Sequence, residues 1–326
     1  LFVALTAIAL CGLCACGTLI TYPDAGMYSY DVGVNGTTSQ GFVNKYSVDN
    51  IDIDWISGQV NIVYDDVKEI TLTETSNKEL DDKSAMHWYP YKETLYVKYG
   101  AGNFYSKAGM KKTLTVTLPS EFACKDFTIS MASGNFNCKN LVCDQFSANL
   151  SSGDIDGDLT CQDFKLNMAS GIANVMLAAQ SIDVDIASGD IDLLCTANSQ
   201  TVDISSNSGH VGLWTERVEN LTIDSSSGAV EVNAHSLGIA KITQSSGNLQ
   251  LVTNFGVDSL TCALSSGNIT LRLGAMKGFT AKTKTSSGKV SCDYPVTKNG
   301  DTLVYGDGSS QLDLRTSSGK ITIKNN

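Results

Sequence analysis

Carboxylates recur in pairs at two places, and paired carboxylates are groups that bind Ca²⁺ or cleave glycosidic bonds. Asp154 and Asp156, and likewise Asp190 and Asp192, stand in the pattern Gly-Asp-Ile-Asp. The two pairs belong to units two repeats apart, which is about 10 Å at the spacing of stacked strands. Glycosidase carboxyl groups lie closer together, and the Gly-Gly-x-Gly-x-Asp repeats of calcium-binding β-rolls are missing. We interpret these carboxylates as a solvated strand face and predict no metal site.

Nucleophilic chemistry is not supported by the remaining reactive residues. The three histidines, His87, His210 and His235, show no spacing to Ser, Cys or Asp that would make a triad. The many serines stand in Ser-Gly pairs, which are typical of turns. No glycine-rich loop is followed by Gly-Lys-Ser/Thr, so a phosphate site is not indicated. We therefore predict no catalytic residue and no cofactor.

Three of the ten cysteines occupy one recurring position. Cys124, Cys143 and Cys161 each lie ten residues before the glycine of a Ser-Gly pair. Other units carry Val, Leu or Ala there, so we expect an inward-facing column of small apolar side chains. A disulfide between neighbouring members is geometrically conceivable. Zinc is disfavoured, because no Cys-x-x-Cys pair occurs beyond the N-terminal segment.

Aromatic residues cluster between 88 and 105, and three of them are our candidate binding residues: Trp88, Tyr89 and Tyr91. Exposed aromatic rings stack on sugars or anchor protein partners. The alternative is that these rings plug one end of the fold.

The element that must position all these residues is a repeat. A Ser-Gly pair returns about every 19 residues between Gly134 and Gly288, with further copies at Gly58 and Gly319. Apolar residues stand two and four places after the glycine and seven and five places before it. Such alternation indicates strands buried on one face. Each unit is therefore predicted to be a strand, a corner, a strand and a turn, with a glycine that tolerates positive φ at the corner.

Units of this kind bury their apolar faces by stacking. We predict an all-β fold, a single-stranded β-helix or β-solenoid of about ten to eleven rungs over residues 41–326. Right-handed winding is expected, because parallel crossovers favour it. Residues 63–118 break the period and are predicted to form an irregular N-terminal cap of strands and a loop. Regular rungs then fill 119–326, with a projecting hairpin or loop inserted at 294–310.

The first 20 residues contain no charge. We interpret residues 1–16 as a secretory signal ending in a lipobox-like Leu13-Cys14-Ala15-Cys16, with Cys16 as the lipidation candidate. The alternatives are an uncleaved membrane helix, for which 20 apolar residues suffice, and a buried core strand. Residues 17–40 are predicted to be a tether. Either form of anchor places the repeats outside the cytoplasm.

The net charge is −11, and arginine occurs three times, at 217, 272 and 315. No basic stripe with interleaved aromatics occurs, so nucleic acid is not an expected partner. The acidic balance favours solubility.

Three features together resemble a known family. They are Ile51-x-Ile-x-Trp-x-Ser-Gly-x-Val-x-Ile, the strand Leu114-Thr-Val-Thr-Leu-Pro119, and the train of Ser-Gly units. This order is similar to that of the bacterial β-strand-repeat family labelled "putative adhesin", whose function is unknown. The resemblance implies the stacked fold over 41–326 and an extracytoplasmic, membrane- or lipid-anchored location. It supplies no catalytic motif.

We therefore predict a non-catalytic cell-surface solenoid that acts as an adhesin, scaffold or binding module of the bacterial envelope. Its expected partner is a glycan or a surface protein, with membrane contact through the N-terminal anchor. One alternative is a carbohydrate-active β-helix enzyme of the lyase or hydrolase type. Another is an envelope sensor that binds its partner through residues 63–118. An enzyme needs a cleft with converging charged groups, whereas a binding scaffold needs only a polar face.

Overall fold

The computed structural model describes residues 36–100 and 109–325, and these residues are almost entirely β-strand with connecting turns. A short 3₁₀ helix, η1 (Lys45–Ser47), is the one helical turn in this described part. The chain divides into two compact units, the first extending to Val175 and the second beginning at Met176. This confirms the all-β class as a mostly parallel stack of strands.

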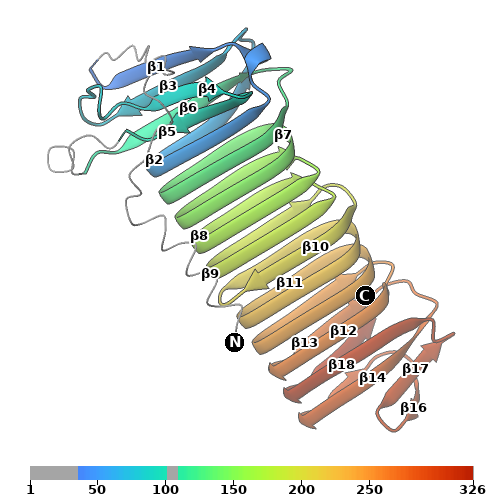
Figure 1. Ribbon diagram of the computed structural model, residues 1–326. Helices are drawn as coiled ribbons and strands as arrows, with labels where there is room; N and C mark the ends of the chain where they lie inside the picture. The colour runs from blue at the N-terminus through green and yellow to red at the C-terminus, as the bar shows by residue number, and fades with distance from the viewer. Residues whose placement is uncertain (1–35, 101–108, 326) are drawn as a thin grey trace. The chain divides into compact units, whose positions relative to one another are not determined.

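The first unit contains the following strands (Figure 1): β1 (Thr38–Val43), β2 (Asn50–Asp65), β3 (Ile70–Ser76), β4 (His87–Tyr91), β5 (Thr94–Lys98), β6 (Lys112–Pro119), β7 (Cys124–Thr160) and β8 (Asp163–Ala178), which ends just beyond the boundary. The second unit contains these: β9 (Ser181–Cys195), β10 (Ser199–Ser206), β11 (His210–Thr253), β12 (Val257–Ser266), β13 (Ile269–Leu273), β14 (Gly278–Ser287), β15 (Val290–Cys292), β16 (Thr297–Asn299), β17 (Thr302–Gly306), β18 (Ser310–Ser318) and β19 (Ile321–Asn325).

The register of the stack follows the alignment on glycine. In the first unit β2 pairs in parallel with β7, so that Gly58 lies opposite Gly134 and Val60 opposite Phe136. In the second unit Val202 of β10 lies opposite Ile182 of β9 and Leu221 of β11. The side chains at these apolar positions are almost completely buried. The predicted strand–corner–strand register is confirmed.

The corners require glycine for two reasons. Gly134 has φ 123°, and Gly228 has φ 119°, a region that L-residues with a side chain rarely adopt. A Cβ atom at either position would also overlap the carbonyl oxygen of the preceding corner, Gly58 or Gly209. Successive corners therefore stack backbone against backbone, which leaves no space for a side chain.

Inside the first unit, aromatic rings form a ladder. The rings of Phe127 and Phe146 lie parallel with centroids 5.7 Å apart, and those of Phe146 and Phe164 lie parallel at 5.3 Å. Each such pair contributes about 0.5–1.5 kcal/mol beyond the burial of its surface. Cys124, Cys143 and Cys161 are buried free thiols, and the Cys124 thiol lies 3.7 Å from the carbonyl oxygen of Val142. The predicted inward column is confirmed.

The cap of the first unit is more regular than its sequence suggests. Strands β5 and β6 pair in parallel with β2, placing Leu95 opposite Ile51 and Leu114 opposite Val60. They therefore form a further rung on the edge of β2 that β7 does not occupy. Antiparallel strands complete the cap: β3 pairs with β6, β1 with β3, and β4 with β5. Strand β1 begins at Thr38, so the end of the segment predicted to be a tether, residues 17–40, belongs to this cap.

At the end of the second unit, spatial order departs from chain order. Leu312 of β18 lies opposite Leu260 of β12 on one edge and Ala281 of β14 on the other. Strand β19 lies in the same way between β13 and β15. The last rung of the sequence is thus inserted between its two predecessors, and Figure 1 shows β18 lying between β12 and β14. The spacing of the Ser-Gly pairs did not reveal this.

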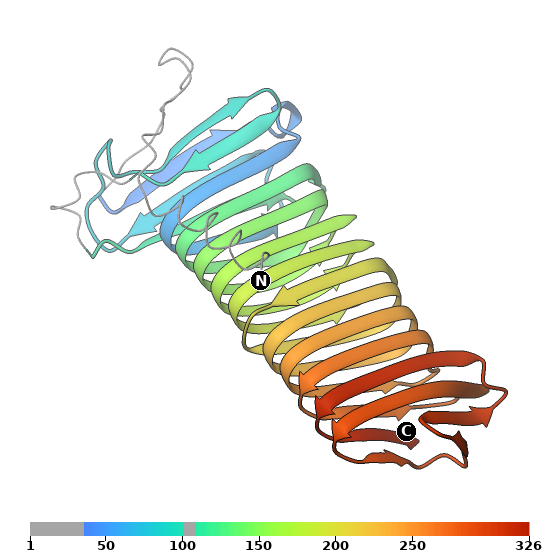
Figure 2. The same cartoon turned by 60° about the horizontal axis from the view of Figure 1, so that its bottom comes forward.

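Two consequences follow for residues near that end. Val290 and Cys292 were predicted to face the core, but they are half-exposed, because their rung is the outermost one in the stack and has β19 as its neighbour. Strands β16 and β17 form an antiparallel hairpin, and β17 also pairs with β14. This hairpin lies within residues 294–310, the segment predicted to project as a hairpin or loop (Figure 2).

Candidate functional site

The predicted binding aromatics of the cap do not share one surface. Trp88 is buried, with 6% of its surface exposed, and its indole fills the space above Gly41. Tyr89 and Tyr91 point to the opposite face of β4 and are half-buried. The Tyr89 ring stacks on that of Tyr96 with centroids 5.0 Å apart. The proposal that these residues bind a partner stays a prediction, and Cys16 lies outside the described residues.

A buried ion pair in the cap is the most enclosed polar cluster of the described residues in the first unit. The Lys112 ammonium lies 2.8 Å from Glu74 Oε1, and neither side chain is exposed. Lys112 also donates to the carbonyl oxygens of Ser84 and Gly100 and lies 4.0 Å from the centroid of the Tyr99 ring. Glu74 Oε2 accepts hydrogen bonds from Ser39 and the Met86 amide. Its groups are satisfied within the protein, so we interpret this cluster as structural.

The three histidines contact different neighbours. Burial, together with the charge of Lys112, lowers the pKa of His87. His210 Nε2 lies 3.5 Å from Asp192, and the His235 ring packs on Phe255 with centroids 4.5 Å apart. None of these contacts pairs a histidine with a serine or cysteine nucleophile. Among the residues that the structure describes, no cluster of three or more His, Cys, Asp or Glu side chains could hold a metal ion.

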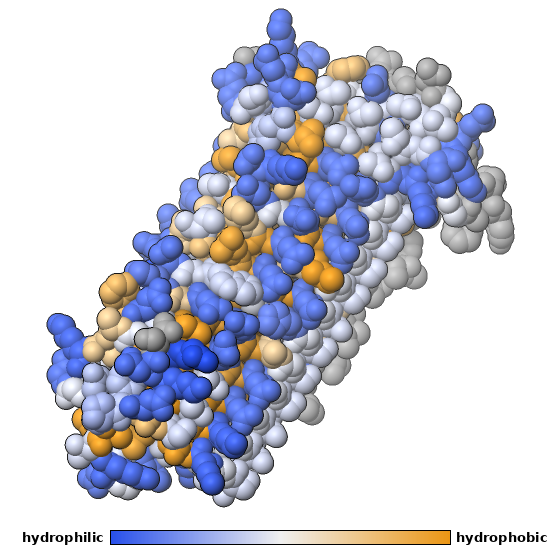
Figure 3. Space-filling model, turned by 180° about the vertical axis from the view of Figure 1, so that it is seen from behind, coloured by the Kyte–Doolittle hydropathy of each residue, from blue (hydrophilic) through white to orange (hydrophobic). Residues whose placement is uncertain are grey.

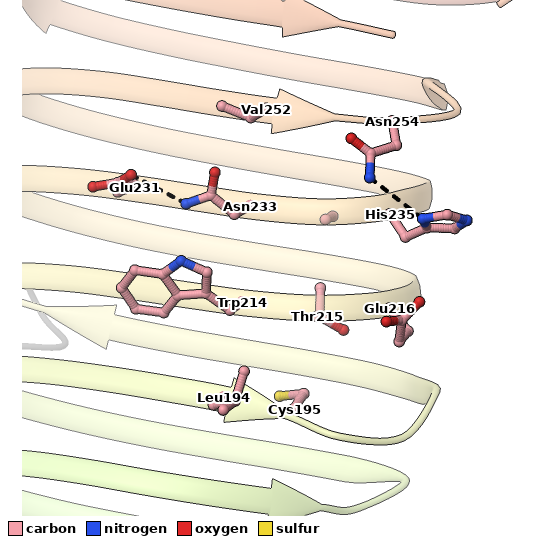
Figure 4. Close-up of a pocket in the computed structure, with 11 residues that line it drawn as sticks. Leu194, Cys195, Trp214, Thr215, Glu216, Glu231, Asn233, His235, Val252 and Asn254 are labelled. Atoms are coloured by element: carbon pink, nitrogen blue, oxygen red, sulfur yellow. Dashed lines mark hydrogen bonds between the residues drawn. The ribbon is translucent and has the colours of Figure 1, made fainter. Parts of the chain in front are cut away.

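The candidate site is a groove on the outer face of the second unit, with a volume of about 570 Å³ (Figure 4). We call it the Trp214 groove. Its lining residues come from β9, β11 and the turn after β11: Leu194, Cys195, Trp214, Thr215, Glu216, Glu231, Asn233, Ala234, His235, Val252 and Asn254.

The repeat explains why these side chains meet. Leu194, Trp214, Asn233 and Val252 each stand five places after a corner glycine, so they form one outward column on successive rungs. The pairing of β9 with β11 places Leu194 opposite Trp214. The parallel column two places earlier contains Gly212, which lies between Asp192 and Glu231 in the stack. A glycine at this point leaves a hollow in an otherwise side-chain-covered face.

The Asp192 carboxylate and the Trp214 indole together fill that hollow. A Cβ atom at residue 212 would lie 2.5 Å from indole Cζ3 and 2.7 Å from Cη2. The ring therefore lies next to Gly212, and Figure 4 shows it flat against the ribbon of β11. One face of the ring packs against the strand, and the other is turned toward the groove. A half-exposed indole held in this way is a rigid, flat, apolar platform.

Polar groups surround the platform. Glu231 Oε1 accepts hydrogen bonds from Asn233 Nδ2 at 3.1 Å and from Gln250 Nε2 at 3.4 Å. At one end of the groove, Asn254 Nδ2 lies 3.4 Å from His235 Nδ1. The groove thus presents oriented carboxylate and amide groups beside an aromatic face. Burial raises the pKa of the Cys195 thiol to about 12, so this cysteine is a neutral lining group rather than a nucleophile.

Sequence reasoning missed this site, although a signal was available. Trp214 is one of three tryptophans, and the register already placed it on an outward position. Gly212 stands two places before it, where other units carry a polar side chain. A large aromatic residue beside a glycine, on a strand face that is otherwise polar, indicates a candidate binding surface.

The sequence matches the Toastrack DUF4097 family over residues 48–239 and again over 195–324. The chain belongs to the Toastrack DUF4097 family. The resemblance drawn from the Ser-Gly train is therefore confirmed. The two Toastrack matches overlap over residues 195–239, which include Trp214. No protein with a curated description matches the chain.

Solved structures similar to this Toastrack chain share little sequence with it. A "putative adhesin" from Parabacteroides merdae is 14% identical, with 89% of this chain and 97% of that chain covered and a TM-score of 0.42. A "putative lipid binding protein" from Parabacteroides distasonis is 13% identical over 89% and 98%, with a TM-score of 0.39. A "putative cell adhesion protein" from Clostridium sporogenes is 12% identical over 90% and 100%, with a TM-score of 0.27. Likenesses this remote say nothing about ligand or activity. Within the described residues, no helix has the length and apolar character needed to cross a membrane.

Proposed function

We propose that the chain is a non-catalytic binding module with an adhesin-like role and that the Trp214 groove is its ligand site. The observation that carries this proposal is the indole of Trp214 lying flat on Gly212 beside an oriented carboxylate and amides. An aromatic platform flanked by hydrogen-bonding groups is suited to a ligand that has one apolar face and a polar edge. Sugars have this character, so we propose a glycan as the ligand.

Binding without catalysis is supported by the chemistry of the groove. The carboxylate of Glu231 is held by two amide donors, and the lining cysteine is a neutral thiol. The groove is open along the sheet face, unlike the closed, water-excluding sites in which charged groups gain catalytic strength. The alternative of a polysaccharide-cleaving enzyme predicts that products are released with time, which can be measured alongside binding.

We further propose an extracytoplasmic location, with the chain held at the membrane through Cys16 or through an uncleaved apolar segment within residues 1–20. A right-handed solenoid of about ten to eleven rungs would then present long polar faces at the cell surface. Figure 3 is compatible with this role, because hydrophilic side chains predominate on the face shown and hydrophobic ones form small separate groups.

A second candidate function, partner binding through the cap, is favoured by one observation. The stacked and half-exposed Tyr89 and Tyr96 have the Lys98 ammonium 5.6 Å from the Tyr96 centroid. Aromatic residues beside a cation are common at the centres of protein interfaces. We propose a protein as the partner of this surface.

The test is a glycan array followed by titration calorimetry on the intact chain and on Trp214→Ala. We expect the substitution to weaken binding of the array hit at least about tenfold, because it removes the platform. Lys139→Ala alters the same outward column in the first unit, outside the groove, and should bind like the parent. Equal affinity of parent and Trp214→Ala would overturn the proposed site, and a steady release of reducing ends would overturn the non-catalytic function.

A further inference from the structure

The charge of the Trp214 groove carries an inference about ligand class, which rests on the proposed function. We propose that the groove selects uncharged pyranose sugars and rejects their uronic-acid counterparts. The aromatic platform alone would accept a sugar, another aromatic ring or a quaternary ammonium group. The groups around it decide among these ligands.

The carboxylates of the groove disfavour anions. Glu216 and Glu231 both line it, and none of its described lining residues is Lys or Arg. Two arginines lie outside this lining. The guanidinium of Arg217 donates to Glu219 at 2.7 Å and 3.0 Å and to Ser236 at 3.2 Å. Arg272 lies opposite Val252, one rung beyond the end of the groove and two rungs from Glu231 in the stack. A ligand carboxylate beside Glu216 and Glu231 would meet like charges, a juxtaposition that is a recognised means of rejecting wrong partners.

The same groups favour hydroxyl-rich ligands. A carboxylate accepts hydrogen bonds but cannot donate them, and its bonds with O–H donors are about twice as strong as neutral ones. Two amide donors already fix the orientation of the Glu231 carboxylate, so its remaining lone pairs face a ligand without first having to be ordered. Asn233 and Asn254 add groups that both donate and accept, which matches sugar hydroxyls, whereas a quaternary ammonium has no proton to donate.

The apolar part of the groove fits a pyranose ring. The face of a pyranose is covered by C–H bonds with a slight positive charge, and the face of an indole is negative. Leu194 lies opposite Trp214 on the neighbouring rung and extends this apolar floor. Val252 stands in the same column two rungs from the indole, beyond Asn233. The volume of about 570 Å³ falls within the range of small-ligand sites.

The experiment compares matched pairs of probes: oligosaccharides of β-1,4-glucan, β-1,4-mannan and β-1,4-galactan, each used as such and after oxidation of C6 to the uronate. Tetramethylammonium is the cationic probe. We expect at least one neutral oligosaccharide to bind at least about tenfold more tightly than its uronate at low salt. The ratio should shrink as salt is raised, because screening weakens the repulsion.

Variants connect this selectivity to the groove. Glu231→Gln and Glu216→Gln should each narrow the neutral-to-uronate ratio severalfold. Asp203→Asn makes the same change of charge on the exposed face of β10, outside the groove, and should leave the ratio unchanged. Uronates that bind as tightly as the neutral sugars, or a tetramethylammonium affinity above theirs, would overturn this inference while leaving a Trp214-dependent site intact. The absence of Trp214-dependent binding to any probe would overturn the proposed function itself.

Discussion

The Lys112–Glu74 pair is one of few places in the cap where a charged side chain replaces an apolar one. Lys112 lies next to Gly58 of the adjoining rung, since a Cβ there would overlap the Lys112 carbonyl oxygen. At this corner the Ser-Gly pair of the regular rungs is replaced by a lysine whose ammonium is satisfied by two carbonyl oxygens and a carboxylate. Buried pairs of this kind often add little net stability, but losing one partner is costly.

Lys112→Met should therefore destabilise the first unit by about 3–5 kcal/mol, because it leaves Glu74 charged and unpaired in the interior. The double variant Lys112→Met/Glu74→Gln should recover most of that loss, since a neutral amide is easier to bury. Urea denaturation followed by tryptophan fluorescence measures both effects. If the single and double variants unfold at the same urea concentration, an unpaired Glu74 charge is not what destabilises the cap.

Cys138 offers a test of how dry the core is. Its side chain is 3% exposed, and burial raises its pKa to about 12, whereas an unfolded thiol ionises near 8.5. The stability that comes from keeping the thiol neutral is thus fully present below about pH 8.5. It is lost as the pH rises toward 12, because only the unfolded chain can then release the proton.

Cys138→Ala should flatten the decline of stability above pH 8.5. Between pH 8 and pH 10.5 we expect the parent to lose about 2–3 kcal/mol more than the variant, since the other buried thiols are common to both. Urea midpoints at several pH values measure the difference. Parallel pH profiles for parent and variant would mean that this thiol is open to water.

At the scale of elements, the corner is the unit that the sequence repeats. Its glycine combines positive φ with direct backbone contact, and these two requirements can be separated. Gly228 meets both, whereas Gly300 has φ 59° and no neighbouring atom within 4 Å of an added Cβ.

Gly228→Ala should consequently destabilise the second unit far more than Gly300→Ala does. The Gly300 variant bears only the backbone strain, about 1–2 kcal/mol. The Gly228 variant must also push neighbouring corners apart, and we expect a loss of at least about 3 kcal/mol. Thermal melts of the two proteins provide the comparison. A similar melting temperature for both would show that contact between corners contributes little.

Much of the fold could be predicted from sequence, because alternation about a glycine specifies which residues face inward, and the pairing of Val60 with Phe136 follows from it. The position of β18 could not, since its apolar positions, such as Leu312, resemble those of every other rung and fit either edge of a neighbour. The Trp214 groove was missed for a similar reason. Periodicity sorts residues into buried and outward, and it does not distinguish an outward residue that is solvated from one that builds a site.

At the scale of the whole molecule, the two compact units share one construction rule but end differently. The first is completed by antiparallel strands β1, β3 and β4, and the second by the insertion of β18 and β19. The antiparallel strands of the first unit cover strand edges that would otherwise invite aggregation, and β17 does the same for an edge of β14 in the second unit. The net charge of −11 adds general repulsion between copies.

Removing residues 310–326 should leave β14 and β15 without the strands that hold them. We expect residues 278–309 to become sensitive to protease, while β9 to β13 stay protected, because their pairings with one another are kept. Limited proteolysis with mass spectrometry maps the cuts. A truncated chain with unchanged protection in 278–309 would show that β14 and β15 are stable without β18 and β19.

The insertion of β18 and β19 also constrains how the chain can be made. During translation, β14 and β15 leave the ribosome before the strands that separate them from β12 and β13 exist. They must either wait undocked or pair with β12 and β13 first and then release them. The end of the second unit therefore cannot mature until β18 and β19 have been synthesised. A premature pairing of β14 and β15 with β12 and β13 would be a kinetic trap, because it occupies the edges to which β18 and β19 bind.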